Sequence, residues 1–315
     1  MSLHFIDCVA DDIVPECTGR DGLVVTAMIE ATLLSLAQKR AVAMSEVLDF
    51  EVRMMPSTLD LFRLDGKTAF VSGASRGLGR VMALALADAG ANVAISGRTA
   101  ASLSATVGEL EARGVKAWGI EGDMATPEGA EATCRAVLAT AGTPDVIINN
   151  VGNRSLNVPI EDQTTDSWRE LFDFNLTSTF IATRDLGRAM IAGGRGGRII
   201  NIASMSGLII NRGIGGRHYE SAKAAVLHFT RATASDWAPH GINVNSISPG
   251  LMMTETNQRW ERDHPEVIER LSAGIPLGRP GRPEEIGPLA LYLASPASSY
   301  VTGANFVVDG GYTVW

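Results

Sequence analysis

Hydrophobic positions from residue 67 onward form short runs separated by longer segments of mixed character. The runs are rich in Val, Ile and Ala and cover residues 68–72, 92–96, 115–120, 145–149, 198–203, 242–248 and 305–309. Runs of this length that are apolar on both faces predict strands of a buried parallel sheet. Most of them are separated by segments with a helical spacing of apolar residues, at 78–89, 100–113, 127–140, 166–192 and 219–238. The alternation predicts repeated βαβ units.

This repetition predicts an α/β fold: a Rossmann-type, doubly wound parallel sheet with helices on both faces, as a single domain over residues 59–315. Right-handed crossovers bring the carboxyl ends of all strands to one edge of such a sheet. We therefore expect any ligand to lie along that edge. The segment from Met252 to Ile275, punctuated by polar residues and a proline, predicts a small helical lid over the substrate.

Residues 1–58 have a different character. They begin with acidic residues, continue with a helix-favouring stretch from Thr26 to Phe50, and break at Pro56. One interpretation is an added helix that docks on the body or on a neighbouring subunit. The other is a loosely held appendage, or sequence upstream of a natural start at Met54 or Met55. We assign no chemistry to this extension.

The composition is that of a globular protein, with 45% hydrophobic and 20% charged residues. The formal net charge of -8 argues against a nucleic acid or an anionic membrane as a partner. No apolar run reaches the ~20 residues of a membrane span, and we find no targeting signal. Cys8, Cys17 and Cys134 are too scattered for a disulfide framework and favour a cytoplasmic location. The five histidines form no ligand-spaced set, so no metal is predicted.

The first predicted strand runs directly into a glycine-rich turn, SGASRGLG, and then into a helix. Gly73 permits a tight turn, Gly77 lets the backbone approach a pyrophosphate, and Gly79 lets the helix pack closely on the strand. The amino terminus of the helix then faces the charge of the phosphate. Because the pattern lies between a strand and a helix, it predicts a dinucleotide site.

The end of the second strand indicates which dinucleotide is bound. An acidic residue here would bind the ribose hydroxyls of NAD, but the position is Gly97. Arg98 follows it, and Arg76 projects from the glycine turn toward the same place. Two guanidinium groups are suited to clamp a 2'-phosphate, which favours NADP(H) over NAD(H).

A second group of residues predicts proton-transfer chemistry. Tyr219 and Lys223 begin a predicted helix at a spacing that puts both on one face. Ser204 lies just upstream, at the end of the strand RIINIAS. An isolated tyrosine and lysine at this spacing form an ordinary surface pair. Together with Ser204 and the nucleotide turn, they indicate a catalytic site.

From about Leu64 to Trp315 the chain resembles the short-chain dehydrogenase/reductase family. The matching features are the glycine turn, Asp123 after the third strand, NNVG at Asn149–Gly152, Asn175, Ser204, the Tyr219/Lys223 pair, and SPG at Ser248–Gly250 followed by Thr254. The resemblance implies an NADP-dependent oxidoreductase that interconverts a ketone and a secondary alcohol. It also implies a homotetramer formed through the helices at 166–192 and 219–238 and the last strand.

The resemblance implies four catalytic residues. Tyr219 is the general acid in reduction and the base in oxidation. Lys223 supplies the charge that lowers the pKa of this phenol, ordinarily ~10, and binds the nicotinamide ribose. Ser204 hydrogen-bonds the reacting oxygen, and Asn175 holds a water that passes protons onward from Lys223.

The resemblance also implies the cofactor site, in which Asp123 binds the adenine ring, Asn150 and Gly152 line the floor, and Gly250 and Thr254 contact the nicotinamide end. The full set of implied cofactor-binding residues is Gly73, Ser75, Arg76, Gly77, Leu78, Gly79, Arg98, Asp123, Met124, Asn150, Gly152, Tyr219, Lys223, Pro249, Gly250 and Thr254.

The chain departs from the family pattern at three places. Ser72 replaces the usual threonine, and its hydroxyl can make the same local bond. Val151 stands where alanine is usual and adds bulk near the adenosine. The loop between Ser204 and Tyr219 is about two residues longer than in many relatives. We expect its polar members to reach the substrate; they are Asn211, Arg212, Arg217 and His218.

Motifs around the loop and the C-terminus are similar to those of the branch that acts on polyols, ketoses and sugar acids, gluconate 5-dehydrogenase being one type. Arginines near the pocket would suit a carboxylate. The alternative is a 3-oxoacyl-[acyl-carrier-protein] reductase, which would need a basic surface for its acidic carrier. A catalytically silent NADP sensor or scaffold is a further alternative, but we expect such a protein to lose Tyr219 or Lys223.

Overall fold

The computed structural model describes residues 57–154, 158–211 and 214–314, together with 28–29, 31–33 and 35–41. The chain divides into two compact units, Met1–Asp60 and Leu61–Trp315. In the first unit, residues 28–29, 31–33 and 35–38 are helical, as expected from the composition there. Residues 39–41 of the expected helix are not helical, and its other residues, with Cys8, Cys17, Met54 and Met55, lie outside the described residues.

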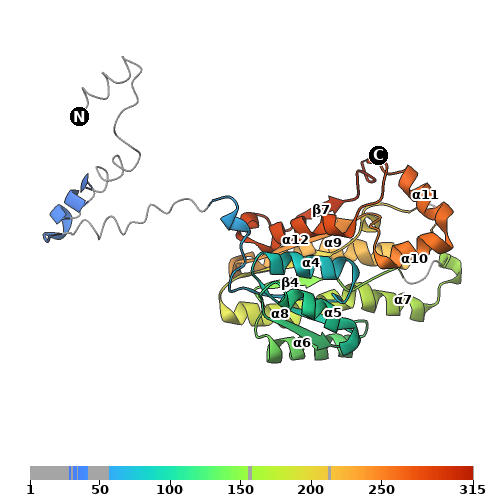
Figure 1. Cartoon of the computed structure of the whole chain (residues 1–315), viewed down its shortest axis with the longest axis horizontal. Coiled ribbons are helices and arrows are strands. Elements are labelled where there is room, and N and C mark those ends of the chain that lie inside the picture. The colour runs from blue at the N-terminus through green and yellow to red at the C-terminus, as the bar shows by residue number, and fades with distance from the viewer. Residues whose placement is uncertain are drawn as a thin grey trace, which may run out of the picture. The chain divides into compact units, whose positions relative to one another are not determined.

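The second unit is built on a seven-stranded sheet (Figure 1). All neighbouring strands pair in parallel. The strands are β1 (Thr68–Val71), β2 (Asn92–Gly97), β3 (Ala117–Glu121), β4 (Val146–Asn149), β5 (Gly197–Ile202), β6 (Ile242–Pro249) and β7 (Asn305–Val308). Their order, β3-β2-β1-β4-β5-β6-β7, reverses direction between β1 and β4. A ligand crevice is expected at this reversal, beyond the carboxyl ends of the strands.

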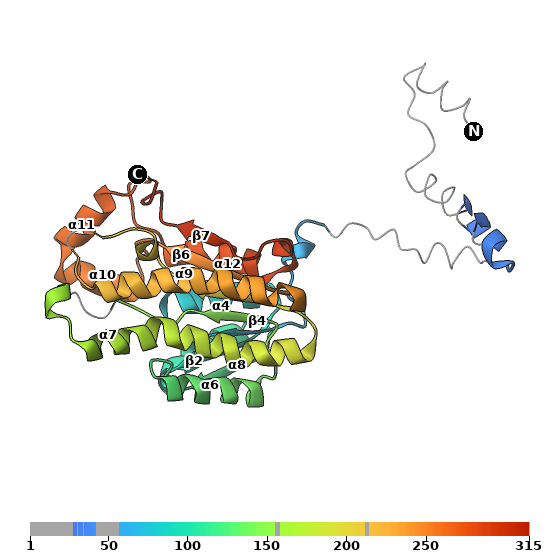
Figure 2. The same ribbon diagram turned by 180° about the vertical axis from the view of Figure 1, so that it is seen from behind.

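Helices cover both faces of the sheet, which confirms the predicted doubly wound fold (Figure 2). Residues of α4, α5 and α12 pack with Val71 and Ile148 in one core. Residues of α6, α8 and α9 pack with Phe70 and Ile147 in the other. These helices are α4 (Gly77–Asp88), α5 (Ala100–Glu111), α6 (Pro127–Thr140), α8 (Ser178–Gly193), α9 (Arg217–Trp237) and α12 (Gly287–Ala294).

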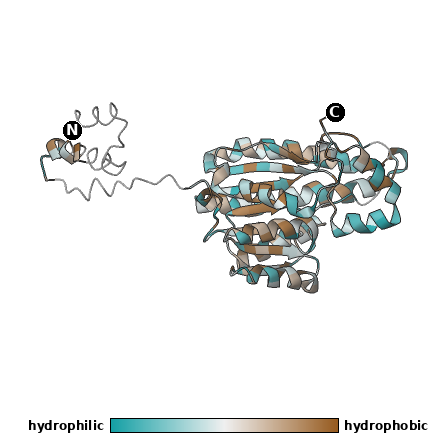
Figure 3. Ribbon diagram, turned by 45° about the horizontal axis from the view of Figure 1, so that its top comes forward, coloured by the Kyte–Doolittle hydropathy of each residue, from teal (hydrophilic) through white to brown (hydrophobic). Residues whose placement is uncertain are grey.

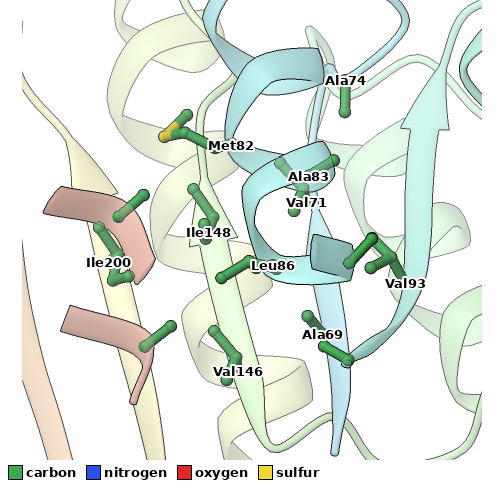
Figure 4. Packing of buried hydrophobic residues seen from close by; sticks show 14 of the residues in the cluster. Ala69, Val71, Ala74, Met82, Ala83, Leu86, Val93, Val146, Ile148 and Ile200 are labelled. Atoms are coloured by element: carbon green, nitrogen blue, oxygen red, sulfur yellow. The ribbon is translucent and has the colours of Figure 1, made fainter. Parts of the chain in front are cut away.

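The two cores exist because consecutive strand residues point to opposite faces. In β1, Ala69 and Val71 contact the first core, where Met82 and Leu86 of α4 pack on them (Figure 4). Phe70, between them in the sequence, belongs to the other core. Hydrophobic residues are accordingly concentrated along the strands (Figure 3). This explains why the strands appear in the sequence as continuous apolar runs rather than alternating ones.

The segment predicted as one helix over 166–192 is more complex. It consists of α7 (Thr165–Phe172), a π-helical turn η3 (Asp173–Thr177) and α8. Buried apolar residues lie on both sides of the turn, Leu171 in α7 and Ile181 in α8, so the segment is predicted as one helix. Turns of this kind are frequent at functional sites, and Asn175 lies at the centre of this one.

The predicted lid consists of two short helices, α10 (Glu255–Asp263) and α11 (Pro265–Ala273), visible near the C-terminus in Figure 1. The hydroxyl of Thr254 caps α10 by accepting a hydrogen bond from the amide of Asn257. Among the described residues, none of the helices combines the length and the apolar character needed to cross a membrane.

Candidate active site

The glycine turn between β1 and α4 has the geometry that its sequence predicts. Gly73 and Gly77 have φ of 63° and 58°, in the left-handed region that favours glycine. A Cβ on Gly79 would lie 2.5 Å from the carbonyl oxygen of Gly73 and 2.5 Å from Nδ2 of Asn150. The absence of three side chains therefore leaves the backbone open at the amino terminus of α4, where an anion is favoured.

This close approach predicts the effect of Gly79→Ala. We expect the added methyl to lower the free energy of unfolding by ~1–3 kcal/mol, as overpacking does, because its nearest neighbours include the backbone. Gly108 is the matched control, since it also lies within a helix, α5, and has nothing within 4 Å of its Cβ position. Gly108→Ala should raise the stability by ~0.5–1 kcal/mol. Chemical denaturation of both variants measures the difference; equal effects would contradict the close approach.

The two departures from the family pattern at this turn are accommodated. The Ser72 hydroxyl accepts hydrogen bonds from the amides of Asn150 at 2.9 Å and Val151 at 3.2 Å. It thereby joins the end of β1 to the loop after β4. The side chain of Val151 packs against Gly73, with its Cγ2 3.0 Å from the Cβ position of that glycine. The serine thus makes the local bonds expected of a threonine.

Ser204 and Tyr219 meet where β5 and α9 face each other. Ser204 follows β5 and caps a 3-10 turn, η4 (Met205–Gly207), by accepting from the amide of Ser206 at 3.1 Å. Its side chain hydrogen-bonds Tyr219. Burial raises the pKa of Tyr219 above its usual value, whereas the bond from Ser204 and the charge of Arg154 lower it in part. The balance keeps the phenol protonated at neutral pH.

Lys223 lies one turn further along α9. Its Nζ donates to the carbonyl oxygen of Ile202 at 2.9 Å and lies 5.8 Å from the ring centre of Tyr219. Burial lowers the pKa of Lys223 to about 8, because the charged form is desolvated. In the structure, the groups that lower the pKa of Tyr219 are Ser204, through its hydrogen bond, and Arg154, through its charge. The lowering expected from Lys223 stays a prediction.

Asn175 is buried in the π-helical turn beside Lys223. Its Nδ2 donates to the carbonyl oxygens of Asn153 at 3.0 Å and Leu171 at 3.1 Å, while its Oδ1 has no partner among the described residues. A Cβ on Gly152 would lie 2.5 Å from this Oδ1 and 3.0 Å from Nζ of Lys223. The fold thus brings together the four residues predicted to be catalytic.

Sequence comparisons support this arrangement. A sequence profile described as Enoyl-(Acyl carrier protein) reductase matches residues 73–313. Galactitol 2-dehydrogenase (L-tagatose-forming) of Cereibacter sphaeroides is 41% identical over 255 residues, which cover 81% of this chain and 98% of that protein. Gluconate 5-dehydrogenase of Gluconobacter oxydans is 37% identical, with the same coverage. The chain belongs to the short-chain dehydrogenase/reductase family. It is an oxidoreductase that acts on CH–OH groups.

Solved structures agree with the family. A short-chain type dehydrogenase/reductase from Mycobacterium marinum is 43% identical, with a TM-score of 0.76 over 82% of this chain and 99% of that one. A putative NAD(P)-dependent gluconate 5-dehydrogenase from Beutenbergia cavernae, solved with bound NADP, is 37% identical, with a TM-score of 0.75 over 81% of this chain and all of that one. The family binds NAD(P), and the open backbone of the glycine turn fits such a cofactor.

Two arginines of this dehydrogenase are exposed near the glycine turn, where the adenosine of the cofactor is expected. Arg76 precedes α4 and Arg98 follows β2, and neither guanidinium group makes a hydrogen bond or an ion pair with the described residues. Arg80, one turn further along α4, is by contrast held by Glu109. Nothing in the described part of the chain therefore competes with a phosphate for Arg76 and Arg98.

The other implied cofactor residues also surround the carboxyl ends of the strands. Asp123, after β3, is exposed and uses one carboxylate oxygen to accept from the amide of Ala125 at 3.0 Å. Met124 is buried beside it. Thr254 lies 3.7 Å from the Cβ position of Gly77 and thus connects the lid with the glycine turn. The remaining implied members of this edge are Ser75, Leu78, Pro249 and Gly250.

The polar residues between β5 and Tyr219 make contacts within the protein, and the contact with substrate expected of them stays a prediction. Asn211 is buried and donates to Oγ of Ser206 at 2.8 Å, and Arg217 pairs with Glu220 at 2.6 Å. His218 is fully buried, with both ring nitrogens unpartnered among the described residues. The polar members therefore organise the loop itself, while Arg212 lies outside the described residues. We find no group of three or more ligand-type side chains suited to a metal ion in the described part of the chain.

Sequence reasoning missed Arg154 and Glu220. Arg154 follows the NNVG motif by two positions, and Glu220 lies between Tyr219 and Lys223. Their side chains approach each other to 3.4 Å beside the ring of Tyr219. The two residues are 66 positions apart in the chain, so the local sequence pattern could not predict that they pair.

Proposed function

We propose that this enzyme uses NADP(H) to interconvert a ketone and a secondary alcohol on a ketose, a polyol or a sugar acid such as 5-ketogluconate/gluconate. The observation that carries the proposal is the convergence of Tyr219, Ser204, Lys223 and Asn175 beside the glycine turn. The substrate class is supported by relatives that act on galactitol and gluconate at 41% and 37% identity.

In reduction, the hydroxyl of Tyr219 would donate its proton to the carbonyl oxygen of the substrate, which Ser204 would hold by a hydrogen bond. The cofactor supplies the hydride. In oxidation, the phenolate of Tyr219 would accept the proton of the substrate hydroxyl. Because burial raises the pKa of Tyr219, neutral pH favours its role as an acid, and oxidation should become faster as the pH rises.

Lys223 would bind the nicotinamide ribose, and Asn175 would help to pass protons from Lys223 toward solvent. The unpartnered Oδ1 of Asn175 and the buried Nζ of Lys223 both border Gly152, so a ribose or a water arriving there would meet both groups. The Oδ1 of Asn175 favours such an occupant, because a buried polar atom without a partner is costly.

The preference for NADP(H) rests on Arg76 and Arg98. Both are exposed and unpaired among the described residues, and Gly97 offers no carboxylate for the ribose hydroxyls of NAD. A guanidinium group binds phosphate by two parallel hydrogen bonds. Structural relatives with bound NADP support the same preference.

The arginines near the reacting centre share one carboxylate of the chain. Arg154 and Arg217 both contact the carboxylate of Glu220, at 3.4 and 2.6 Å, so this carboxylate competes with one from the substrate. The experiment is a turnover screen with NADPH and NADP⁺ across ketoses, polyols, ketogluconates and acetoacetyl thioesters. We expect activity on the first three groups.

A 3-oxoacyl-[acyl-carrier-protein] reductase is the second candidate, because the matching profile is described by a reductase of acyl-carrier-protein substrates. Activity confined to thioesters in the same screen would favour it and contradict our proposal. A silent sensor or scaffold would turn over none of the compounds. Retention of all four catalytic residue types argues against that alternative.

We further propose a homotetramer in the cytoplasm. An apolar hollow between α8 and α9 includes Phe180 and Phe229, whose rings pack edge to face. Phe180 is 42% exposed, and a second copy of the chain would cover it. Burial raises the pKa of the Cys134 thiol to about 12, so this cysteine is unreactive and is compatible with a reducing compartment.

A further inference from the structure

Arg154 occupies an unusual place over the face of Tyr219. Its Cζ lies 4.7 Å from the centre of the phenol ring. The side chain is only 16% exposed. The guanidinium donates to the carbonyl oxygen of Gly215 at 2.7 Å, to Oγ of Ser206 at 3.3 Å and to Oε1 of Glu220 at 3.4 Å. Acceptors from the loop after β5 and from α9 thus fix one cation over one ring.

A cation in this position acts on the two protonation states of Tyr219 unequally. It is attracted to the face of a neutral aromatic ring. It is attracted more strongly to a phenolate, whose full negative charge it meets at short range through partly desolvated surroundings. The guanidinium also remains charged at every pH at which the protein is folded. Lys223, whose pKa is about 8, loses its charge as the pH rises.

We propose that Arg154 is a positioning residue of this reaction, and that its guanidinium, held over the ring of Tyr219 by the carbonyl oxygen of Gly215, stabilises the phenolate that takes the substrate proton. The catalytic role that we infer for Arg154 rests on the proposed function. In oxidation, the O–H bond of the substrate breaks and its proton passes to Oη of Tyr219, while the hydride passes to NADP⁺. In reduction, the same proton returns from Tyr219 to the carbonyl oxygen.

The groups facing Tyr219 from the neighbouring elements determine the direction of each effect. The loop after β4 contributes Arg154, and α9 contributes Lys223. The end of β5 contributes the neutral Ser204. The nearest described anion in this network is Glu220, which is buried and shared between Arg154 and Arg217. Its negative charge opposes that of Arg154 at the phenolate.

Of the further neighbours of α9, α7 carries Asp166, Arg169 and Glu170, all exposed to solvent, and the first two form an ion pair. In η3, the carboxylate of Asp173 accepts from Thr177 within its own turn, and the amide of Asn175 is neutral. In η4, Ser206 is neutral and accepts from both Arg154 and Asn211. Arg154 and Glu220 are therefore a pair of opposite charges whose separate removal should shift the ionisation of Tyr219 in opposite directions.

The test compares Arg154→Met, Arg154→Lys and Glu220→Gln in the full chain. The pH midpoint of kcat/KM for alcohol oxidation should rise by about one unit in Arg154→Met, which is an approximately tenfold loss of oxidation below the midpoint. Arg154→Lys keeps the charge and should recover at least half of the shift. Glu220→Gln keeps the shape of the side chain, removes the opposing charge, and should move the midpoint downward.

A purely structural role gives a different pattern, in which both Arg154→Met and Glu220→Gln shift the midpoint in the same direction or leave it in place. Either result overturns the inference. Should Arg154→Met fail to fold, the signs of the Arg154→Lys and Glu220→Gln shifts decide. The dissociation constant of NADPH serves as the control, and it should remain within about twofold in every variant.

A second measurement separates this inference from the proposed function. The ultraviolet absorbance of tyrosinate follows the ionisation of Tyr219 directly, as the difference between each protein and its partner carrying Tyr219→Phe, which subtracts the other three of the four tyrosines. Less tyrosinate at alkaline pH in Arg154→Met supports the inference even if no tested alcohol is oxidised. Unchanged tyrosinate overturns it even if the enzyme turns over polyols.

Discussion

Tyr219→Phe should reduce turnover by about 10²–10⁴-fold in both directions, the range that general acid–base catalysis supplies. The substitution removes one oxygen and leaves the ring, so the packing of Arg154 on its face is retained. Lys223 also keeps its bond to the carbonyl of Ile202. NADPH should therefore bind with an unchanged dissociation constant. Steady-state kinetics and NADPH fluorescence titration measure the two quantities separately.

Tyr300→Phe is the matched control for this prediction, since it removes the same hydroxyl from a tyrosine that is fully exposed. Its turnover should equal that of the unaltered enzyme. If Tyr219→Phe kept full activity, the proton-transfer mechanism would be wrong. If it lost NADPH binding as well, the loss of turnover would no longer identify Tyr219 as the acid.

The second large effect is expected at the adenosine end of the site. Replacing Arg76 and Arg98 together by Ala should raise the dissociation constant of NADPH by ~100-fold, about tenfold for each charge-assisted contact. The constant for NADH should change by less than about threefold, because NADH carries no 2'-phosphate. Both side chains are exposed and unpaired among the described residues, so the protein should keep its stability. Calorimetric titration with each cofactor measures the ratio.

Arg113→Ala provides the control for nonspecific charge effects. Arg113 pairs with Asp88 and lies at the end of α5, away from the carboxyl edge of the sheet. Its removal should leave both dissociation constants unchanged. Equal weakening of NADPH and NADH by the double replacement would show that the arginines support the loop rather than select the phosphate. A strong preference of the unaltered enzyme for NADH would contradict the proposed selection of NADPH by Arg76 and Arg98.

Much of the fold could be predicted because burial leaves a regular record in the sequence. The central strands β1, β2, β4, β5 and β6 are mostly buried and therefore mostly apolar, whereas the edge strands β3 and β7 are partly exposed. Each of the seven predicted strands matches an observed one within two residues. The turn glycines could be predicted for a local reason, since Gly73, Gly77 and Gly79 satisfy backbone requirements of a turn only a few residues long.

The interior of the 166–192 helix and the active-site loop could not be predicted in this way. The π-helical turn at Asp173–Thr177 changes the winding locally, between two helices that both bury apolar residues. Asn211 lies in the loop and Arg217 begins α9, and both are polar residues for which the sequence suggested contact with substrate. Only the structure shows that their partners are Ser206 and Glu220.

The sequence by itself determined the sheet, the dinucleotide turn and the identities of the four predicted catalytic side chains, because each depends on periodicity or on residues close together in the chain. Only the tertiary structure decided which charged groups act on the ionisation of Tyr219. Lys223, one helical turn away, is desolvated and bonded to a carbonyl, whereas Arg154, 65 positions away in the chain, lies on the ring. Electrostatic interactions depend on distance and burial in space, and these are set only when β4, β5 and α9 come together.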